Sequence, residues 1–156
     1  MLCIAIMLTA PGLAFFLEPD PADAVDLHKI ELQVHQAVNQ ARNSRHLPEL
    51  AWNEPLAAEA RRHASRIVSG RFFAHQDPVR GDIDRRLNRS GIEWMRCAEN
   101  LYEGDNHELA KEAVKAWLLS EGHRRNMLDS MFSDAGVGIA FKKDKTVVIV
   151  QEYIFK

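Results

Sequence analysis

The sequence predicts a single-domain protein of the α+β class, in which helices come first and an antiparallel β-hairpin comes last. Apolar residues recur every three or four positions through the first three quarters of the chain, the spacing of amphipathic helices. The last quarter changes to a period of two, and its two apolar runs lie too close together for a crossover helix. A length of 156 residues suits one domain. We therefore expect an antiparallel sheet with helices on both faces.

Two amphipathic helices are expected first. The apolar stripes at 26–45 and 53–69 each form one face of a helix. Asn53 can cap the second helix, and Pro55 fits its first turn. Gly70 is the expected stop of this helix.

The remaining elements are shorter. They are, in order, a loop (71–81), a short helix (82–89), a strand (95–102), a helix ending near 120, a helical turn (123–128) and a hairpin (135–141 and 146–155). Asp105, followed three residues later by Glu108, has the spacing of a capping box and predicts the start of the helix that ends near 120.

The N-terminal segment predicts export. Residues 1–17 carry no charge, and a small-x-small sequence, Ala22-Asp23-Ala24, offers a cleavage site. We interpret residues 1–24 as a signal peptide or an N-terminal membrane anchor, and residues 25–156 as the folded domain. A buried N-terminal helix is the alternative, but the acidic, proline-containing stretch at 18–23 is typical of a linker. The domain would then be extracytoplasmic, either secreted or anchored to the envelope, and would meet a membrane only through this segment.

Charge and cysteine content limit the function classes. Removing residues 1–24 takes away three acidic residues and no basic ones, so the formal charge would change from −2 to +1. A nearly neutral domain lacks the electrostatic footprint of a nucleic-acid-binding protein, and we expect no nucleic-acid partner. Arginines at helical spacing could still form a local basic patch, although such residues more often lie on solvated faces. The candidates are Arg61, Arg62, Arg66, Arg85, Arg86 and Arg89.

Only one cysteine would remain in the exported domain. Cys3 lies in the N-terminal segment, which leaves Cys97 without a disulfide partner in the domain. We interpret Cys97 as a buried small apolar residue with a poorly activated thiol.

One triplet stands out chemically, Glu121-Gly122-His123. On a continuous helix, residues two apart point about 200° apart and cannot share a site. Gly122 at a helix end could take a left-handed conformation and reverse the chain, so that Glu121 and His123 flank one cleft. A helix-capping role without function is the alternative. His75, in an aromatic loop, and Glu99 are two further candidates that carry little weight alone.

Several motifs in order resemble the CAP superfamily, which includes cysteine-rich secretory proteins, antigen 5 and pathogenesis-related proteins. The resemblance covers about residues 28–155. Its motifs are Phe73-Ala74-His75, Ala98-Glu99-Asn100-Leu101, the block from Trp117 to Leu128 and Gly136-Val137-Gly138. The block from Trp117 to Leu128 is similar to the bacterial SCP-like branch, and the shortage of cysteines agrees with that branch.

The resemblance implies a three-layer α-β-α sandwich with a central antiparallel sheet. It also implies a cleft tetrad of His75, Glu99, Glu121 and His123. Two neutral imidazoles could bind Zn²⁺ or another divalent metal, with the glutamates completing or orienting the ligand set. Ser120 is a candidate lining residue, although helix capping suits it better. Asn126 is expected to pin its helix to neighbouring backbone.

Three functions remain open at this stage. The first is an exported binding module whose cleft holds a metal and an unknown small molecule, peptide or lipid. The second is a metal-assisted or acid–base hydrolase with Glu99 and Glu121 as candidate catalytic residues. No nucleophile is evident, so an enzyme is the weaker interpretation. The third is a structural or interaction protein without catalysis. The oligomeric state is left open, and Tyr102 is a further candidate to line the cleft.

Overall fold

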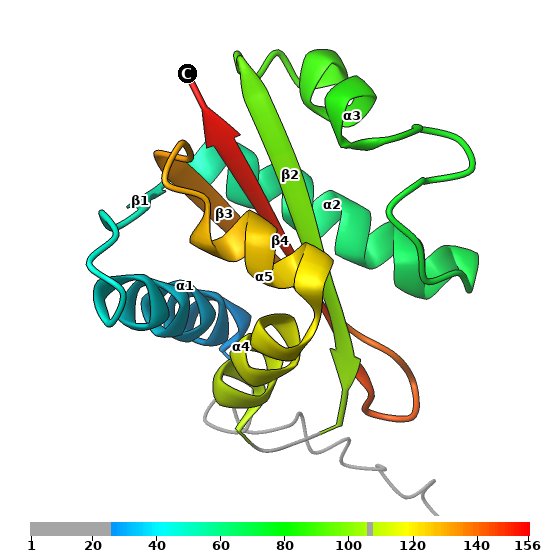
Figure 1. Ribbon diagram of the computed structural model, residues 1–156. Helices are drawn as coiled ribbons and strands as arrows, with labels where there is room; N and C mark the ends of the chain where they lie inside the picture. The colour runs from blue at the N-terminus through cyan, green and yellow to red at the C-terminus, as the bar shows by residue number, and fades with distance from the viewer. Residues whose placement is uncertain (1–25, 106–107) are drawn as a thin grey trace, which may run out of the picture.

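The computed structural model describes residues 26–105 and 108–156, which form a four-stranded sheet with helices on both sides (Figure 1). The segment 1–24, with the expected signal or anchor and Cys3, lies outside the described residues. The elements, in order, are α1 (Leu27–Asn43), β1 (Ala51–Trp52), α2 (Glu54–Gly70), α3 (Ile83–Arg89), β2 (Arg96–Gly104), α4 (Leu109–Leu119), α5 (Glu121–Leu128), β3 (Asp134–Phe141) and β4 (Val147–Phe155).

The strand order across the sheet is β1-β3-β4-β2. The expected C-terminal hairpin is confirmed, because β3 and β4 pair antiparallel from Asp134–Ile154 to Phe141–Val147. Strand β2 pairs antiparallel with the other side of β4, and Glu99 lies opposite Glu152. The sheet is not wholly antiparallel, since the two residues of β1 pair parallel with β3. Strand β2 therefore forms one edge of the sheet.

Helices cover the two faces of the sheet differently. Helix α2 packs across β3 and β4 on one face, while α1, α4 and α5 pack on the other (Figure 1). The buried strand β4 shows the division, because Val148 and Val150 pack with α2 while Ile149 and Tyr153 join the core on the opposite face. The three-layer α-β-α fold expected from the sequence is confirmed.

Two glycines let α2 lie directly on β3. A Cβ atom on Gly136 would come within 2.2 Å of the Ala57 nitrogen, and one on Gly138 within 2.0 Å of the Arg61 nitrogen. No side chain fits at those distances, because the atoms in the way belong to the helix backbone. The close contact holds α2 and its polar residues against the sheet.

Helix ends agree with the sequence in part. Asn53 caps α2 as expected, and its side chain accepts a hydrogen bond from the Leu56 nitrogen at 3.1 Å. Helix α2 ends at Gly70, but the left-handed residue after it is Arg71, with φ of 54°. The expected capping box is wrong, because α4 begins at Leu109 with Glu108 in the N-cap position. Within the described part of the chain, no helix has the length and apolar character needed to span a membrane.

Candidate functional site

His75 and Glu99 form a hydrogen-bonded pair. His75 lies in the loop between α2 and α3, and its Nδ1 is 2.8 Å from Oε1 of Glu99 on β2. The carboxylate is almost fully buried, whereas the imidazole is 57% exposed. A carboxylate accepts hydrogen bonds, so Nδ1 carries the proton and donates. The pair therefore leaves Nε2 as the ring nitrogen of His75 that is not bound to Glu99.

The loop that carries His75 is fixed by a buried aspartate. Asp77 Oδ1 accepts hydrogen bonds from the Val79 and Arg80 nitrogens at 2.7 and 2.9 Å. Arg66 on α2 binds both oxygens of the same carboxylate. Arg66 and these two backbone groups hold the pKa of Asp77 well below its usual range. The loop is thus tied to α2 through an ion pair that persists at any physiological pH.

His123 reaches the same place from α5. The ring centroids of His75 and His123 are 6.0 Å apart, with the ring planes inclined at 55°. Two asparagines hold α5 against β2. Asn100 Nδ2 donates to the His123 carbonyl at 3.0 Å, and Asn126 Nδ2 donates to the Glu99 carbonyl at 3.1 Å. The expected role of Asn126, pinning the helix to neighbouring backbone, is confirmed.

His75 and His123 approach each other from opposite faces of the sheet, beside its edge strand β2. Glu99 points to the sheet face covered by α2 and α3, where it contacts Arg86. Asn100 points to the opposite face, where it donates to the Tyr153 hydroxyl at 3.1 Å. His75 thus approaches the strand from the α2 side and His123 from the α5 side. The site depends on β2 being an edge strand, because another strand would occupy this place.

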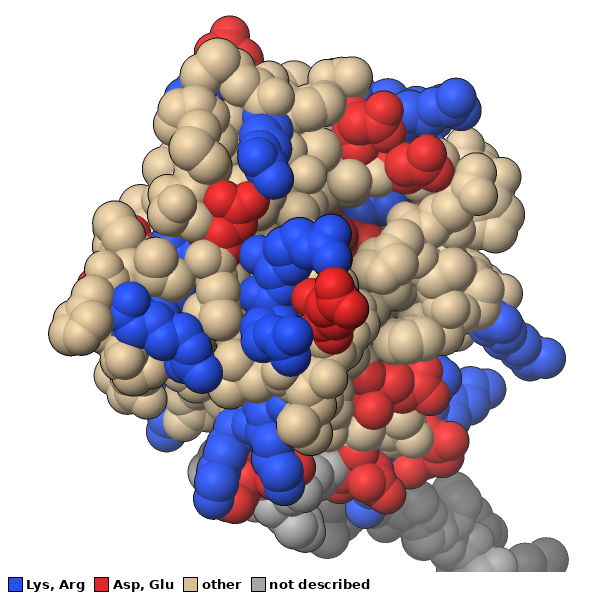
Figure 2. Space-filling view, viewed as in Figure 1, with Lys and Arg blue, Asp and Glu red and all other residues tan. Residues whose placement is uncertain are grey.

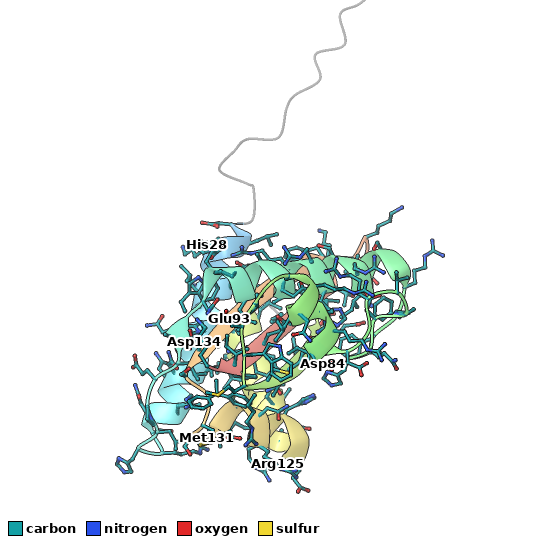
Figure 3. All side chains as sticks on the ribbon, turned by 90° about the horizontal axis from the view of Figure 1, so that it is seen from above. His28, Asp84, Glu93, Arg125, Met131 and Asp134 are labelled. Atoms are coloured by element: carbon teal, nitrogen blue, oxygen red, sulfur yellow. The ribbon has the colours of Figure 1, made fainter. Side chains whose placement is uncertain are left out.

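The Glu121 side chain does not point toward His123. The expected left-handed Gly122 is wrong, since among the described glycines only Gly81 and Gly91 have positive φ. The chain bends earlier, at Ser120, and α5 continues from Glu121 through His123. Glu121 and His123 therefore point in different directions. The Glu121 side chain is 79% exposed and pairs at 3.0 Å with Arg125, which Figure 3 shows at the outer side of α5.

The two candidate lining residues have structural surroundings. Ser120 is the N-cap residue of α5, where its carbonyl accepts from the Arg124 nitrogen at 2.8 Å, but its side chain makes no capping bond. Tyr102 points to the face opposite Glu99 and packs against the core beneath α1 and α4. Neither side chain has a recorded contact with His75 or His123.

A buried ionic cluster behind Glu99 was missed in the sequence. Arg86 on α3 donates to Glu99 Oε2 and, at 3.2 Å, to Glu152 Oε1, and all three side chains are buried. Among the arginines considered for a basic patch, Arg86 is 0% exposed and is not a surface residue. No local pattern identifies it, because one arginine in a short amphipathic helix is usually solvated. Its partners come from other elements.

Arg61 and Arg62, two more of the arginines that could have formed a basic patch, are paired with carboxylates. Arg61 binds both oxygens of the buried Glu31, and Arg62 binds Glu59 at 2.8 Å. Figure 2, in the orientation of Figure 1, shows the opposite face, formed by α1, α4 and α5, which carries both basic and acidic side chains.

Burial favours the neutral form of two histidines, His123 and His63. Burial, and then the neighbouring His75, lower the pKa of His123. Burial also lowers the pKa of His63 on α2, whose Nε2 is 3.7 Å from Glu99 Oε2. Both imidazoles are therefore favoured in the neutral form, which is the form that binds metals.

Cys97 lies on the Glu99 side of β2, because residues two apart on a strand face the same side. It packs with Leu56, Leu87 and Ile154, and burial raises the pKa of its thiol to about 11. A thiol with this pKa is protonated at neutral pH, so Cys97 is a poor nucleophile and a poor metal ligand.

His75 and His123 are the two residues of this site that could hold a metal ion. Nε2 of His75 is free of the Glu99 bond, and His123 favours its neutral form. Glu99 is engaged by His75 and Arg86, so it orients the imidazole from behind. Within residues 26–105 and 108–156, no three His, Cys, Asp or Glu side chains are arranged to hold a metal. Any further ligands would come from solvent or a bound molecule.

The fold and the motif residues assign the chain to a family. Residues 35–153 match the family model described as CAP, the cysteine-rich secretory protein family. The chain belongs to the CAP family. It is 33% identical over 108 residues to the uncharacterized protein YkwD of Bacillus subtilis, covering 69% of this chain and 41% of YkwD.

Solved structures agree with this assignment. An extracellular protein containing an SCP domain, from Bacillus anthracis, is 31% identical with a TM-score of 0.72, over 83% of this chain and 41% of that one. An outer surface protein of Borrelia burgdorferi shares the fold, with a TM-score of 0.74 at 18% identity, over 86% of this chain and 96% of that one. The chain spans about two fifths of the length of YkwD and of the Bacillus anthracis protein.

Proposed function

We propose that the protein is an exported binding module whose ligand site is the pair His75 and His123 at the edge of β2. The observation that carries the proposal is the approach of the two imidazoles to 6.0 Å, with Glu99 orienting one of them. This arrangement supports binding of a divalent metal such as Zn²⁺, because Zn²⁺ accepts neutral imidazole nitrogens as ligands. Support for export comes from the uncharged segment at 1–17 and from the similar Bacillus anthracis protein, which is described as extracellular.

The chain's own residues would hold and shape such a site. His75 and His123 would bind the ion, and Glu99 would keep Nδ1 of His75 protonated so that Nε2 faces outward. Asn100 and Asn126 would fix the distance between the two histidines by tying α5 to β2. A bound Zn²⁺ supplies Lewis acidity and open coordination positions for an anionic or carbonyl-bearing group of a small molecule, peptide or lipid.

Zinc titration by calorimetry at pH 7.5 tests the proposal. We expect one ion per chain, and affinity about tenfold lower or worse in His75→Ala and in His123→Ala. His28→Ala is a matched control, because His28 is 56% exposed, close to the 57% of His75, and it too contacts a buried glutamate, Glu31. Figure 3 shows His28 and the α5 residue Arg125 at opposite ends of the view. Equal binding by the parent and both site variants would overturn the assignment.

A second measurement separates binding from catalysis. We expect the parent to leave a mixture of peptides and peptidoglycan fragments unchanged, because Cys97 is protonated and, in the described part of the chain, no side-chain nucleophile is recorded beside His75 or His123. Hydrolysis by the parent that disappears in folded Glu99→Gln would contradict a pure binding module and support the hydrolase.

A further inference from the structure

A buried ionic cluster extends inward from Glu99. It lies between the sheet and the helices α2 and α3, and its charged members are Glu59, Arg86, Glu99 and Glu152. Each has an exposed fraction of 5% or less. Placing these charges away from water is costly, so a cluster of this kind persists only where its members are well paired. The proposed function above uses only Glu99 from this cluster.

Arg86 contacts all three carboxylates of the cluster, and Glu99 is the closest of them. Glu59 accepts hydrogen bonds from Arg62 at 2.8 Å and from the Ser90 hydroxyl at 2.6 Å. Burial, and then the nearby Glu99, raise the pKa of Glu152 well above its usual value, which favours its neutral form. Arg86 lies 3.8 Å from Glu59 and 3.2 Å from Glu152, and its contact with Glu99 is shorter than both. Arg86 and Glu99 therefore form the closest ion pair of the cluster.

Arg86 also holds the backbone of His75. One terminal nitrogen of its guanidinium donates to the His75 carbonyl at 2.8 Å and to the Gly81 carbonyl at 3.2 Å. The other terminal nitrogen donates to Glu99, and the second oxygen of Glu99 accepts from the His75 ring. One planar guanidinium thus fixes both the main chain of His75 and the carboxylate that orients its imidazole. A lysine ammonium cannot reproduce this fork of donors.

We propose that Arg86 is a positioning residue of the histidine site, which locks His75 in the tautomer that presents Nε2 to a ligand. The proposal rests on the proposed function for its effect on metal binding, but the tautomer itself exists without metal. Without the guanidinium, the Glu99 carboxylate and the 71–81 loop lose their common anchor. His75 then rotates more freely and exchanges between its two tautomers.

The test is a long-range ¹H–¹⁵N spectrum of the zinc-free full chain, which reports the protonated nitrogen of each histidine. We expect the parent to show Nδ1–H at His75 and Arg86→Lys to show a mixture of tautomers. We also expect zinc affinity to fall about 10–100-fold in Arg86→Lys, the usual cost of losing an orienting partner behind a ligand. Arg61→Lys is the matched control, because Arg61 likewise binds a buried glutamate, Glu31, that contacts a histidine, His28. It should leave His75 and zinc binding unchanged.

A second variant covers the case in which Arg86→Lys does not fold. Arg86→Gln with Glu99→Gln replaces the ion pair by neutral amides and leaves no unpaired buried charge. We expect this double variant also to lose the single His75 tautomer. A folded variant of either kind that keeps the parent's tautomer and zinc affinity overturns the role of Arg86. A parent that binds no zinc, but whose tautomer changes in Arg86→Lys, refutes the metal site and supports the positioning role.

Discussion

Replacing Gly138 by alanine should destabilise the protein strongly, because α2 lies against β3 at this position. The added Cβ would lie 2.0 Å from the Arg61 nitrogen and 2.2 Å from the Ala60 carbonyl carbon. Ordinary contacts of this kind are about 3.4 Å or more, so α2 and β3 would have to separate by more than about 1 Å. Overpacking a core costs about 1–3 kcal/mol, and the upper end applies because helix backbone, not a flexible side chain, is in the way. A loss of about 3 kcal/mol corresponds to about 6–12 °C in melting temperature for a chain of this size.

Gly122→Ala provides the control, since it is the same substitution with the opposite expectation. Nothing lies within 4 Å of a Cβ at Gly122, which sits inside α5 with an ordinary helical conformation. Alanine favours a helix over glycine by about 1 kcal/mol, so this variant should be as stable as the parent or more stable. Urea unfolding followed by circular dichroism gives both free energies. Equal stability of Gly138→Ala and the parent would refute the close contact, and a large loss in Gly122→Ala would refute the helical Gly122.

Three further predictions concern the site and the cluster behind it. Glu121→Ala should bind zinc like the parent, because the Glu121 side chain is exposed and pairs with Arg125; weaker binding in calorimetry would return Glu121 to the site. Asn126→Ala should lose about 1–2 kcal/mol of unfolding free energy and bind zinc less tightly, because α5 loses its hydrogen bonds to Glu99 and Asn100. Unchanged zinc affinity would show that other contacts hold α5 against β2. Glu152 has a raised pKa, so the unfolded chain releases this proton above about pH 4.3 while the folded chain keeps it. The free energy of unfolding of the parent should therefore fall relative to that of Glu152→Gln as pH rises from about 4.5 to 7, by at most about 1.4 kcal/mol per pH unit. A difference in urea unfolding that does not change with pH would contradict the neutral Glu152 carboxyl.

The sequence predicted the elements of the fold well because local patterns decide them. The apolar stripe of α2 and its Asn53 cap can be identified from neighbouring residues alone. The hairpin at the C-terminus follows in the same way from its period of two. The capping box at Asp105 failed because a matching pair of residues does not decide where a helix begins, and α4 starts at Leu109.

The site was harder to predict, because its geometry depends on distant contacts. Gly122 can be left-handed or helical, and the choice depends on how α5 packs against β2, which the triplet itself does not encode. Motif resemblance placed His75, Glu99 and His123 in one site, and the structure brings these three together. Arg86 could not be recognised, because its partners Glu99 and Glu152 are 13 and 66 residues away along the chain.

The central claim is that His75 and His123 act on one ligand, and X-ray absorption by the zinc-loaded protein tests it most directly. The number of imidazole nitrogens around the ion can be read from the fine structure of the zinc edge. The two-histidine site predicts two imidazoles in the parent and in His28→Ala, and one in His123→Ala. A zinc ion with one imidazole or none in the parent, or with an unchanged environment in His123→Ala, would contradict it.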